Sequence, residues 1–417
     1  SAKLPAIAID ATVPLGRAMG VLMQPANTLN QRILRGLGFT TALLLGPLVL
    51  QAANPDALPL RATKGLFDVS AKQTLGLKQI PGEHKVLYRA SETGYKFCHH
   101  PQLVVFQDRC YAMWSNGIRD EDTPGQRILV CSSSDGQRWT EPRVLTDHDA
   151  GKGICVAAGF RVYRQQLIAY YTVTGGTNFH PDTALYARLS NDGREWGPAR
   201  RITKGFFINP PLQLSNGHLV IGGEHVGEQR STARMRILVT EAADGLSGWQ
   251  EAKITVKDLK VIGYAEPNMY QRQDGTLVMP LRNYSGFFYV ATSSNQGRSW
   301  STPVKTNFPD STARFALGKL PDKTIYLINN PGPKQFDRHL LAISTSTDGK
   351  EFKRSWIVRH EPTKMRYPGK SKLDGWQYPH AIVWKSFLYV AYSINKEDVA
   401  VTRIPLKHLQ ETTRDRQ

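Results

Sequence analysis

The sequence predicts an all-β protein, and more narrowly a six-bladed β-propeller of four-stranded antiparallel blades. Three observations lead to this fold class. A short turn signature returns four times with a fifth, worn copy, apolar runs of strand length alternate with turn residues, and no long amphipathic helical pattern is present. A fixed period of roughly 50 residues is typical of propellers, in which each repeat is one sheet that shares a core with its neighbours.

The turn signature places Ser, Asp or Asn before Gly and ends on an aromatic residue. Clear copies occupy residues 133–139, 190–196, 293–300 and 346–352, and the worn copy occupies residues 244–249. The aromatic residues stand at positions 139, 196, 249, 300 and 352, so the steps are 57, 53, 51 and 52 residues. Short polar side chains accept hydrogen bonds from nearby amides, glycine supplies a positive φ, and the ring folds back onto the sheet. We expect each copy to be one hairpin turn of a blade, with a structural role.

The apolar runs between these turns supply the strands. First strands are predicted to begin near residues 98, 155, 206, 264, 311 and 378. Asn-Gly at 216–217 and Asp-Gly at 274–275 are typical hairpin turns into second strands, and a third strand leads into each signature. The sixth unit ends in three strands, so residues 85–88 are predicted to add the missing outer strand and close the ring. The alternative is a seventh blade within residues 60–97.

This organisation divides the chain into four parts. Residues 1–53 are predicted to be an export segment, residues 54–94 a linker with the closing strand, residues 95–410 the propeller and residues 411–417 a tail. Arg32 and Arg35 precede an apolar run at 37–50, and Gln-Ala-Ala follows it, which is the pattern of a signal peptide. We therefore expect a secreted or periplasmic protein without stable membrane insertion; a membrane anchor is the alternative.

The overall charge favours an anionic partner. Lys plus Arg exceed Asp plus Glu by 53 − 35 = 18. Because no nucleic-acid-binding motif is present and the basic residues are scattered, we expect an acidic oligosaccharide or polysaccharide and no nucleic acid. The cysteines contain no CxxC pair, so no metal is expected, and both disulfides and buried free thiols remain open. We expect a monomer that needs no cofactor. The four cysteines are Cys98, Cys110, Cys131 and Cys155.

The first strands of a propeller line its central channel, where charged side chains have no packing reason to be. Polar residues on these strands, or at the end of the strand that follows, are therefore the candidate site residues. They are His99, His100, Glu266, Arg282, Arg314, Tyr378 and His380.

The repeat signature resembles the Asp box of sialidase-like propellers, and several site residues also match that family. The stretch from Glu266-Pro267 to Arg282, then Arg314 and Tyr378, is similar to the family's pattern. The resemblance implies that Arg282 and Arg314 bind a substrate carboxylate, that Glu266 takes the proton of Tyr378, and that Tyr378 attacks the anomeric carbon. The family's acid has its nearest counterparts in Asp120, Glu121 and Asp122.

The chain departs from the sialidase pattern on its first blade. Sialidases carry Tyr-Arg-Ile-Pro there, whereas this chain has Cys-His-His-Pro at 98–101, so the third carboxylate-binding Arg is replaced. A histidine on a first strand instead resembles propeller rhamnosidases and rhamnose–glucuronate lyases. That resemblance implies that His99 or His100 is catalytic. Further candidates for such chemistry are His225, Arg366 and Tyr367.

We expect an exported, exo-acting glycoside hydrolase that removes a terminal acidic sugar or a uronate-linked cap from a glycan. One alternative is a polysaccharide lyase that cleaves by elimination. The other is a glycan-binding propeller without catalysis, because a fold alone does not determine a function.

Overall fold

The computed structural model describes residues 57–147, 153–176, 179–332 and 334–410. The predicted export segment and C-terminal tail lie outside these residues. Within the described part, no helix is long and apolar enough to cross a bilayer.

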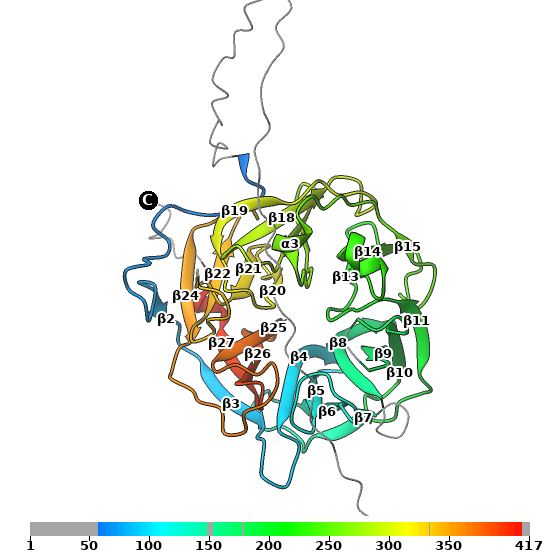
Figure 1. Ribbon diagram of the computed structural model, residues 1–417. Coiled ribbons are helices and arrows are strands. Elements are labelled where there is room, and N and C mark those ends of the chain that lie inside the picture. Colours follow the sequence, from blue (N-terminus) through cyan, green and yellow to red (C-terminus); the bar gives the residue numbers. More distant parts are fainter. Residues whose placement is uncertain (1–56, 148–152, 177–178, 333, 411–417) are drawn as a thin grey trace, which may run out of the picture. The chain divides into compact units, whose positions relative to one another are not determined.

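Six antiparallel sheets are arranged around a common axis, which confirms the six-bladed propeller (Figure 1). In each blade the first strand is innermost, as the sequence predicts. Blades 1 to 3 comprise β4 (Phe97–Phe106), β5 (Arg109–Gly117), β6 (Arg127–Ser133) and β7 (Arg143–Thr146); β8 (Ile154–Tyr163), β9 (Gln166–Thr174), β10 (Ala184–Ser190) and β11 (Arg200–Lys204); and β12 (Leu212–Gln213), β13 (Leu219–Glu224), β14 (Met235–Thr240) and β15 (Gln250–Glu251). Blades 4 to 6 comprise β16 (Tyr270–Gln271), β17 (Leu277–Leu281), β18 (Phe287–Ser293) and β19 (Val304–Pro309); β20 (Ala316–Lys319), β21 (Ile325–Asn329), β22 (Leu341–Ser346) and β24 (Arg354–Arg359); and β25 (Trp376–Trp384), β26 (Phe387–Ile394), β27 (Asp398–Pro405) and β3 (Glu83–Tyr88).

The ring is closed by β3, which pairs antiparallel with β27 in the last blade, where the sequence places the closing strand. The residues before it do not form a seventh blade. They run along blade 5, where β1 (Arg61–Ala62) pairs with β23 (Glu351–Phe352) and β2 (Lys78–Gln79) pairs with β24, both in parallel. Two strands of two residues each cannot bury a sheet face of their own, so this arm covers an existing blade.

The signature segments form the predicted turns between third and fourth strands. The carboxylate of Asp135 accepts hydrogen bonds from the amides of Gln137 and Arg138 at 2.9 and 2.8 Å. Gly136 has φ +74°, and a Cβ there would lie 2.2 Å from the hydroxyl oxygen of Tyr389 on β26 of the neighbouring blade. The turn of blade 1 therefore rests against blade 6, and such turns join adjacent blades.

The inner strands are irregular, and three of them begin later than predicted. The predicted starts near 206, 264 and 311 lie five or six residues before β12, β16 and β20. Pro210 and Pro211 cannot donate to a ladder, and Glu266 and Thr312 have positive φ, so regular pairing is interrupted in these segments. Only isolated contacts precede the strands, such as the bridge between Phe206 and Glu224. In blades 1, 2 and 6 the inner strand is bulged instead, and β4 and β25 shift register beside the site.

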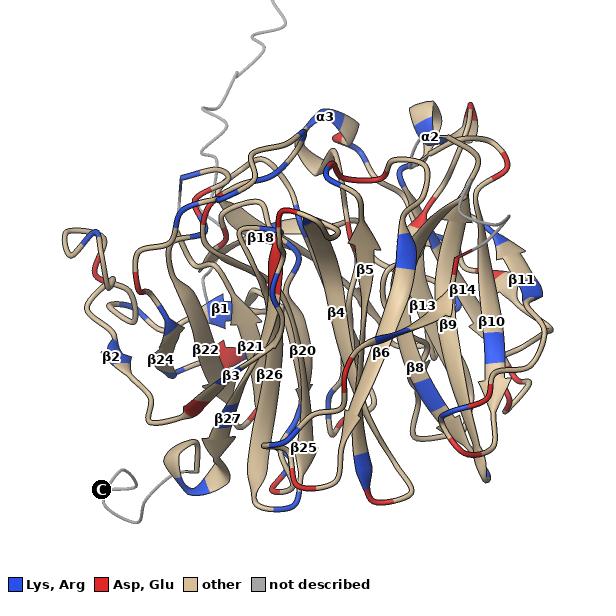
Figure 2. Cartoon of the chain, turned by 90° about the horizontal axis from the view of Figure 1, so that it is seen from below, with Lys and Arg blue, Asp and Glu red and all other residues tan. Residues whose placement is uncertain are grey.

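All four cysteines are buried free thiols, so no disulfide connects the described residues. Lys and Arg occur on many strands and loops of the propeller rather than at one place, as Figure 2 shows. The excess of basic charge therefore does not by itself locate a binding surface.

Candidate active site

The strand topology brings most of the sequence-predicted residues to one end of the propeller. First strands start at the end where second strands finish, and the signature turns lie at the opposite end of each sheet. A cavity of about 390 Å³ opens at the first of these ends. It is lined by Glu121, Tyr264, Glu266, Arg282, Tyr284, Phe336, Arg338, Ser371, Leu373, Tyr378 and Lys396.

Glu266, Arg282 and Tyr378 form a closed hydrogen-bonded triangle at the base of this cavity. The Tyr378 hydroxyl donates to Oε1 of Glu266 at 2.9 Å. Arg282 Nη1 donates to the same carboxylate oxygen at 2.6 Å and to the Tyr378 hydroxyl at 2.7 Å. Glu266 and Tyr378 stand at φ +39° and +57°, conformations that cost a non-glycine residue about 1–2 kcal/mol and that cluster at functional sites. The structure therefore brings together a phenol, a carboxylate and a guanidinium that are far apart in the sequence.

The surroundings of Tyr378 are cationic, and its side chain is buried. Burial raises the pKa of Tyr378 far above its ordinary value, and Arg282 acts in the opposite direction. The guanidinium of Arg338 and the ammonium of Lys396 lie 5.2 and 5.4 Å from the centre of its ring. The hydroxyl is consequently protonated, and it donates to the Glu266 carboxylate.

His99 and His100 occupy the place of the missing arginine, directly against the phenol. The ring centre of His99 lies 3.7 Å from that of Tyr378 and 4.1 Å from that of His100. Burial, together with the nearby charges of Lys396 and Arg314, holds the pKa of both histidines well below the ordinary value. Two neutral imidazoles therefore stand where the sialidase pattern has a permanent cation.

Arg314 does not reach the cavity. Its side chain is completely buried, with Nη2 donating to Oδ1 of Asn209 at 2.6 Å and Nη1 to the carbonyl of Pro379 at 3.2 Å. Burial lowers its pKa to about 10, which still leaves it protonated at neutral pH. Its hydrogen bonds connect blades 5, 3 and 6, so its placement supports a structural role more than the predicted grip on a substrate carboxylate.

Of the acidic run on blade 1, Glu121 alone lines the cavity. Its Oε2 accepts from Lys396 Nζ at 2.6 Å, and its Oε1 lies 3.2 Å from Nε2 of His99. Asp120 accepts from the amide of Lys370 instead. Asp122 is buried against Gln126, and burial raises its pKa to about 7.

Sequence reasoning missed the two cations and the aromatic residues that complete the cavity. Arg338 and Lys396 lie in connections between second and third strands, where no periodic pattern singles them out. Tyr264 and Phe336, with 41% and 43% of their surface exposed, are the two aromatic residues among the exposed large hydrophobic residues of the described chain. Both line the cavity, so its lining combines exposed aromatic rings with charged side chains.

Four further candidates lie outside the cavity. Their interactions connect parts of the propeller, so we do not assign them to the substrate. His225 lies 3.1 Å from Glu251 on the outermost strand β15. His380 accepts from the amide of Leu103 at 3.0 Å, which ties blade 6 to blade 1, and burial lowers its pKa to about 3. Arg366 forms an ion pair with Asp398, and the amide of Tyr367 donates to Glu397 at 2.7 Å.

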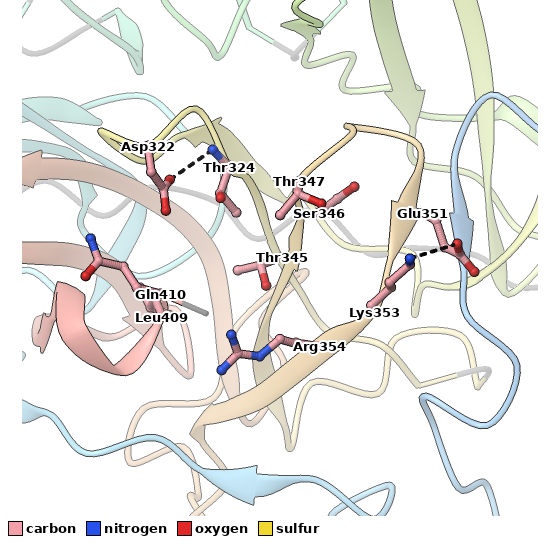
Figure 3. Close-up of a pocket in the computed structure, with 10 residues that line it drawn as sticks. All are labelled: Asp322, Thr324, Thr345, Ser346, Thr347, Glu351, Lys353, Arg354, Leu409 and Gln410. Carbon is pink, nitrogen blue, oxygen red and sulfur yellow. Dashed lines mark hydrogen bonds and ion pairs between the residues drawn. The ribbon is translucent and has the colours of Figure 1, made fainter. Parts of the chain in front are cut away.

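A second pocket lies at the opposite end of blade 5 (Figure 3). It is formed by the turn at Asp322, the signature turn at Ser346 and Thr347, and the C-terminal residues Leu409 and Gln410. Asp322 is engaged by the amide of Thr324, and Lys353 lies 3.7 Å from Glu351. Its lining residues include carboxylates but no tyrosine, so it offers no counterpart to the Tyr378 triangle.

Comparisons with known proteins agree with this architecture. A sialidase structure superposes with a TM-score of 0.61 at 20% identity, covering 84% of this chain and 35% of that one. A Trypanosoma rangeli sialidase in complex with the inhibitor DANA gives 0.60 at 15% identity, covering 79% and 61%. A protein of unknown function from Dyadobacter fermentans gives 0.60 at 16% identity, covering 79% and 99%.

This chain spans less than two thirds of the length of either sialidase. No protein with a curated description matches the sequence. The family model of the BNR repeat-like domain, however, matches residues 108–390, which is more than half of the chain. The chain therefore belongs to the BNR repeat-like domain family and has the six-bladed propeller fold of the sialidases.

Proposed function

We propose that the protein is an exo-acting glycoside hydrolase that removes a terminal acidic sugar from a glycan, with Tyr378 as nucleophile and Glu266 as its base. The observation that carries the proposal is the Tyr378 hydroxyl within 2.9 Å of the Glu266 carboxylate and 2.7 Å of Arg282. A neutral nucleophile suits an anionic substrate, because a carboxylate nucleophile would repel it.

The geometry suggests how the bonds change. Glu266 accepts the phenol proton as the Tyr378 oxygen forms a bond to the anomeric carbon and the glycosidic oxygen departs. Arg282 bonds to both partners, so it stabilises the negative charge that moves between them. Glu121 is the acid that the cavity offers to the departing oxygen, and it would later activate the water that releases the sugar.

The charged and aromatic side chains of the cavity support the choice of substrate. Arg282, Arg338 and Lys396 face one cavity, and burial strengthens their attraction for a carboxylate or a sulfate group. Tyr264 and Phe336 present exposed rings at the same cavity, which suits the apolar face of the next sugar. A terminal acidic sugar joined to a second sugar would contact both the cations and the aromatic rings.

The test combines a substrate panel with one variant. The wild-type protein is incubated with a sialoside, a glucuronide and a rhamnosyl-glucuronate glycan, and we expect reducing sugar without the absorbance of an unsaturated uronate. Tyr378→Phe should lower kcat by at least about 1000-fold, because it removes the attacking oxygen while keeping the ring. Mass spectrometry of the acid-quenched wild-type reaction should find a glycosyl group on the peptide that contains Tyr378.

Several results would contradict the proposal. Unsaturated product would indicate elimination, and binding without any product would indicate a glycan-binding propeller. Full activity of Tyr378→Phe, with thermal unfolding like that of the wild type, would exclude the nucleophile.

A further inference from the structure

A buried ion pair on blade 3 contacts the segment that carries Glu266 on blade 4. Glu224 is the last residue of β13 and only 1% of its surface is exposed. Its Oε1 accepts hydrogen bonds from the amides of Ala265 at 3.0 Å and Glu266 at 3.3 Å. One carboxylate oxygen thus engages two consecutive amides of the neighbouring blade.

The partner of Glu224 contacts the rest of the same segment. Arg230 lies on α2 (Gln229–Thr232), and its Nη2 donates to Glu224 Oε2 at 2.9 Å and to the carbonyl of Gly263 at 3.2 Å. Its guanidinium carbon lies 5.1 Å from the ring centre of Tyr264. In Figure 2, α2 and α3 (Leu259–Ile262), which precedes the segment, lie at the same end of the propeller.

The segment needs such support because sheet pairing does not hold it. The inner strand β16 begins only at Tyr270, and Glu266 has φ +39°. Residues in this region of φ and ψ persist where their surroundings over-determine them. The carbonyl of Ala265 accepts from the amide of Arg282 at 2.9 Å, while the amides of Ala265 and Glu266 both point to Glu224.

We propose that Glu224 and Arg230 are positioning residues that hold residues 263–266 and thereby fix the Glu266 carboxylate against Tyr378. Neither residue lines the cavity, so neither touches the substrate. The pair reaches each of the four residues from Gly263 to Glu266, and it sets both the base and the aromatic ring of Tyr264. The kinetic part of this inference rests on the proposed hydrolase function, whereas the structural part does not.

A carboxylate buried in this way is not explained by stability alone. Burial raises the pKa of Glu224 to about 7, so the charged form is destabilised by burial and the charge of Arg230 offsets this only in part. Ion pairs of this kind are often replaceable by apolar side chains without loss of stability. What the Glu224 carboxylate does specifically is to orient the amides of Ala265 and Glu266, where the backbone is strained.

Hydrogen exchange tests the structural part in the full chain. In Glu224→Gln the side chain keeps a single acceptor oxygen, and in Arg230→Ala the donor to Gly263 is lost. Both variants should exchange the amides of residues 263–266 at least about 10-fold faster, with the other blades unchanged. Glu397→Gln is the matched control, because Glu397 is also 1% exposed and accepts from two consecutive amides, of Arg366 and Tyr367, elsewhere.

Kinetics then test the link to Glu266. We expect kcat to fall about 30-fold in Glu224→Gln, with KM within twofold of the wild-type value. Arg230→Lys should retain a higher kcat than Arg230→Ala. Unchanged exchange at residues 263–266, or equal loosening of all six blades, would overturn the proposal. If the wild-type protein cleaves no glycoside, the hydrolase proposal fails, and the exchange result still decides whether the pair holds the segment. Since Arg230 lies on a short surface helix, Arg230→Ala decides the matter if Glu224→Gln does not fold.

Discussion

At the scale of single residues, the site has two neutral histidine rings where the sialidase pattern has an arginine. His99 and His100 cannot bind a carboxylate as an arginine does, because burial keeps them uncharged. The cationic side chains that do face the cavity are Arg282, Arg338 and Lys396. If the substrate is acidic, its charge must be met from the side of blades 4, 5 and 6.

Lys396→Gln tests this assignment. In the wild type, Lys396 Nζ donates to the Glu121 carboxylate at 2.6 Å. The change removes this cation, so the Glu121 carboxylate faces the substrate without its charged partner. We expect KM for an acidic glycoside to rise about 10-fold, equivalent to about 1.4 kcal/mol, with a smaller effect on kcat. Lys385→Gln, on an exposed hairpin turn, is the control. Equal KM values for the two variants at low salt would exclude Lys396 from substrate binding.

Asp122→Asn should change how stability depends on pH. Burial raises the pKa of Asp122 from 3.8 to about 7, so the folded state binds the proton more tightly than the unfolded chain. Its contribution is present below about pH 4 and is lost as pH rises through about 7. Asparagine stays neutral and tolerates the φ of +50° at this position.

The variant should therefore gain up to about 4 kcal/mol at pH 8 and almost nothing at pH 4. Urea unfolding at both values measures this gain. An equal shift at both pH values would show that the gain comes from the backbone and not from the charge.

The sequence allowed part of the site to be predicted at this scale. Glu266 lies just before the inner strand β16, Tyr378 lies near the start of β25, and Arg282 follows the last residue of a second strand, so the order of the strands brings them to one end of the propeller. Arg338, Lys396 and Glu121 come from connecting loops, whose paths depend on packing between blades. Arg314 lies two residues before the inner strand β20, and its side chain is directed by Asn209 and the Pro379 carbonyl, which no local pattern reveals.

At the scale of the element, the signature turns pack against the adjacent blade and so connect the blades. The aromatic residue of each turn lies in a core shared with the adjacent blade; Trp139, for example, packs with Tyr389. The turns and second strands could be predicted because Gly and Asp carry a local backbone requirement. The short inner strands of blades 3 to 5 could not, since apolar residues in an unpaired segment look like those of a strand.

Gly136→Ala tests the contact between the turn of blade 1 and Tyr389 of blade 6, with Gly275→Ala as a matched control. Both glycines have positive φ, at +74° and +85°, but an added methyl meets Tyr389 at 2.2 Å in the first case and nothing within 4 Å in the second. We expect losses of about 2–4 kcal/mol and about 1 kcal/mol respectively. Urea unfolding followed by tryptophan fluorescence measures both. Equal losses would mean that backbone strain, and not contact between blades, sets the cost.

At the scale of the whole molecule, closure depends on β3. Leu87 on this strand is buried in the core between blades 6 and 1, whereas Lys85 is exposed. Leu87→Asp should lower stability by about 3–5 kcal/mol and promote aggregation, because it places a charge in that core and loosens the closing strand. Lys85→Asp should cost less than about 0.5 kcal/mol. Similar light scattering and urea midpoints for the two would show that β3 does not secure the ring.

The pairing of Tyr88 with Val399 also has a temporal consequence. During translation the ribosome makes β3 before any complete blade and β27 after every other described strand. The first-made strand of the six blades therefore stays unpaired until the last one emerges. Contacts so distant along the chain form slowly, and the nascent protein carries an open sheet edge for most of its synthesis.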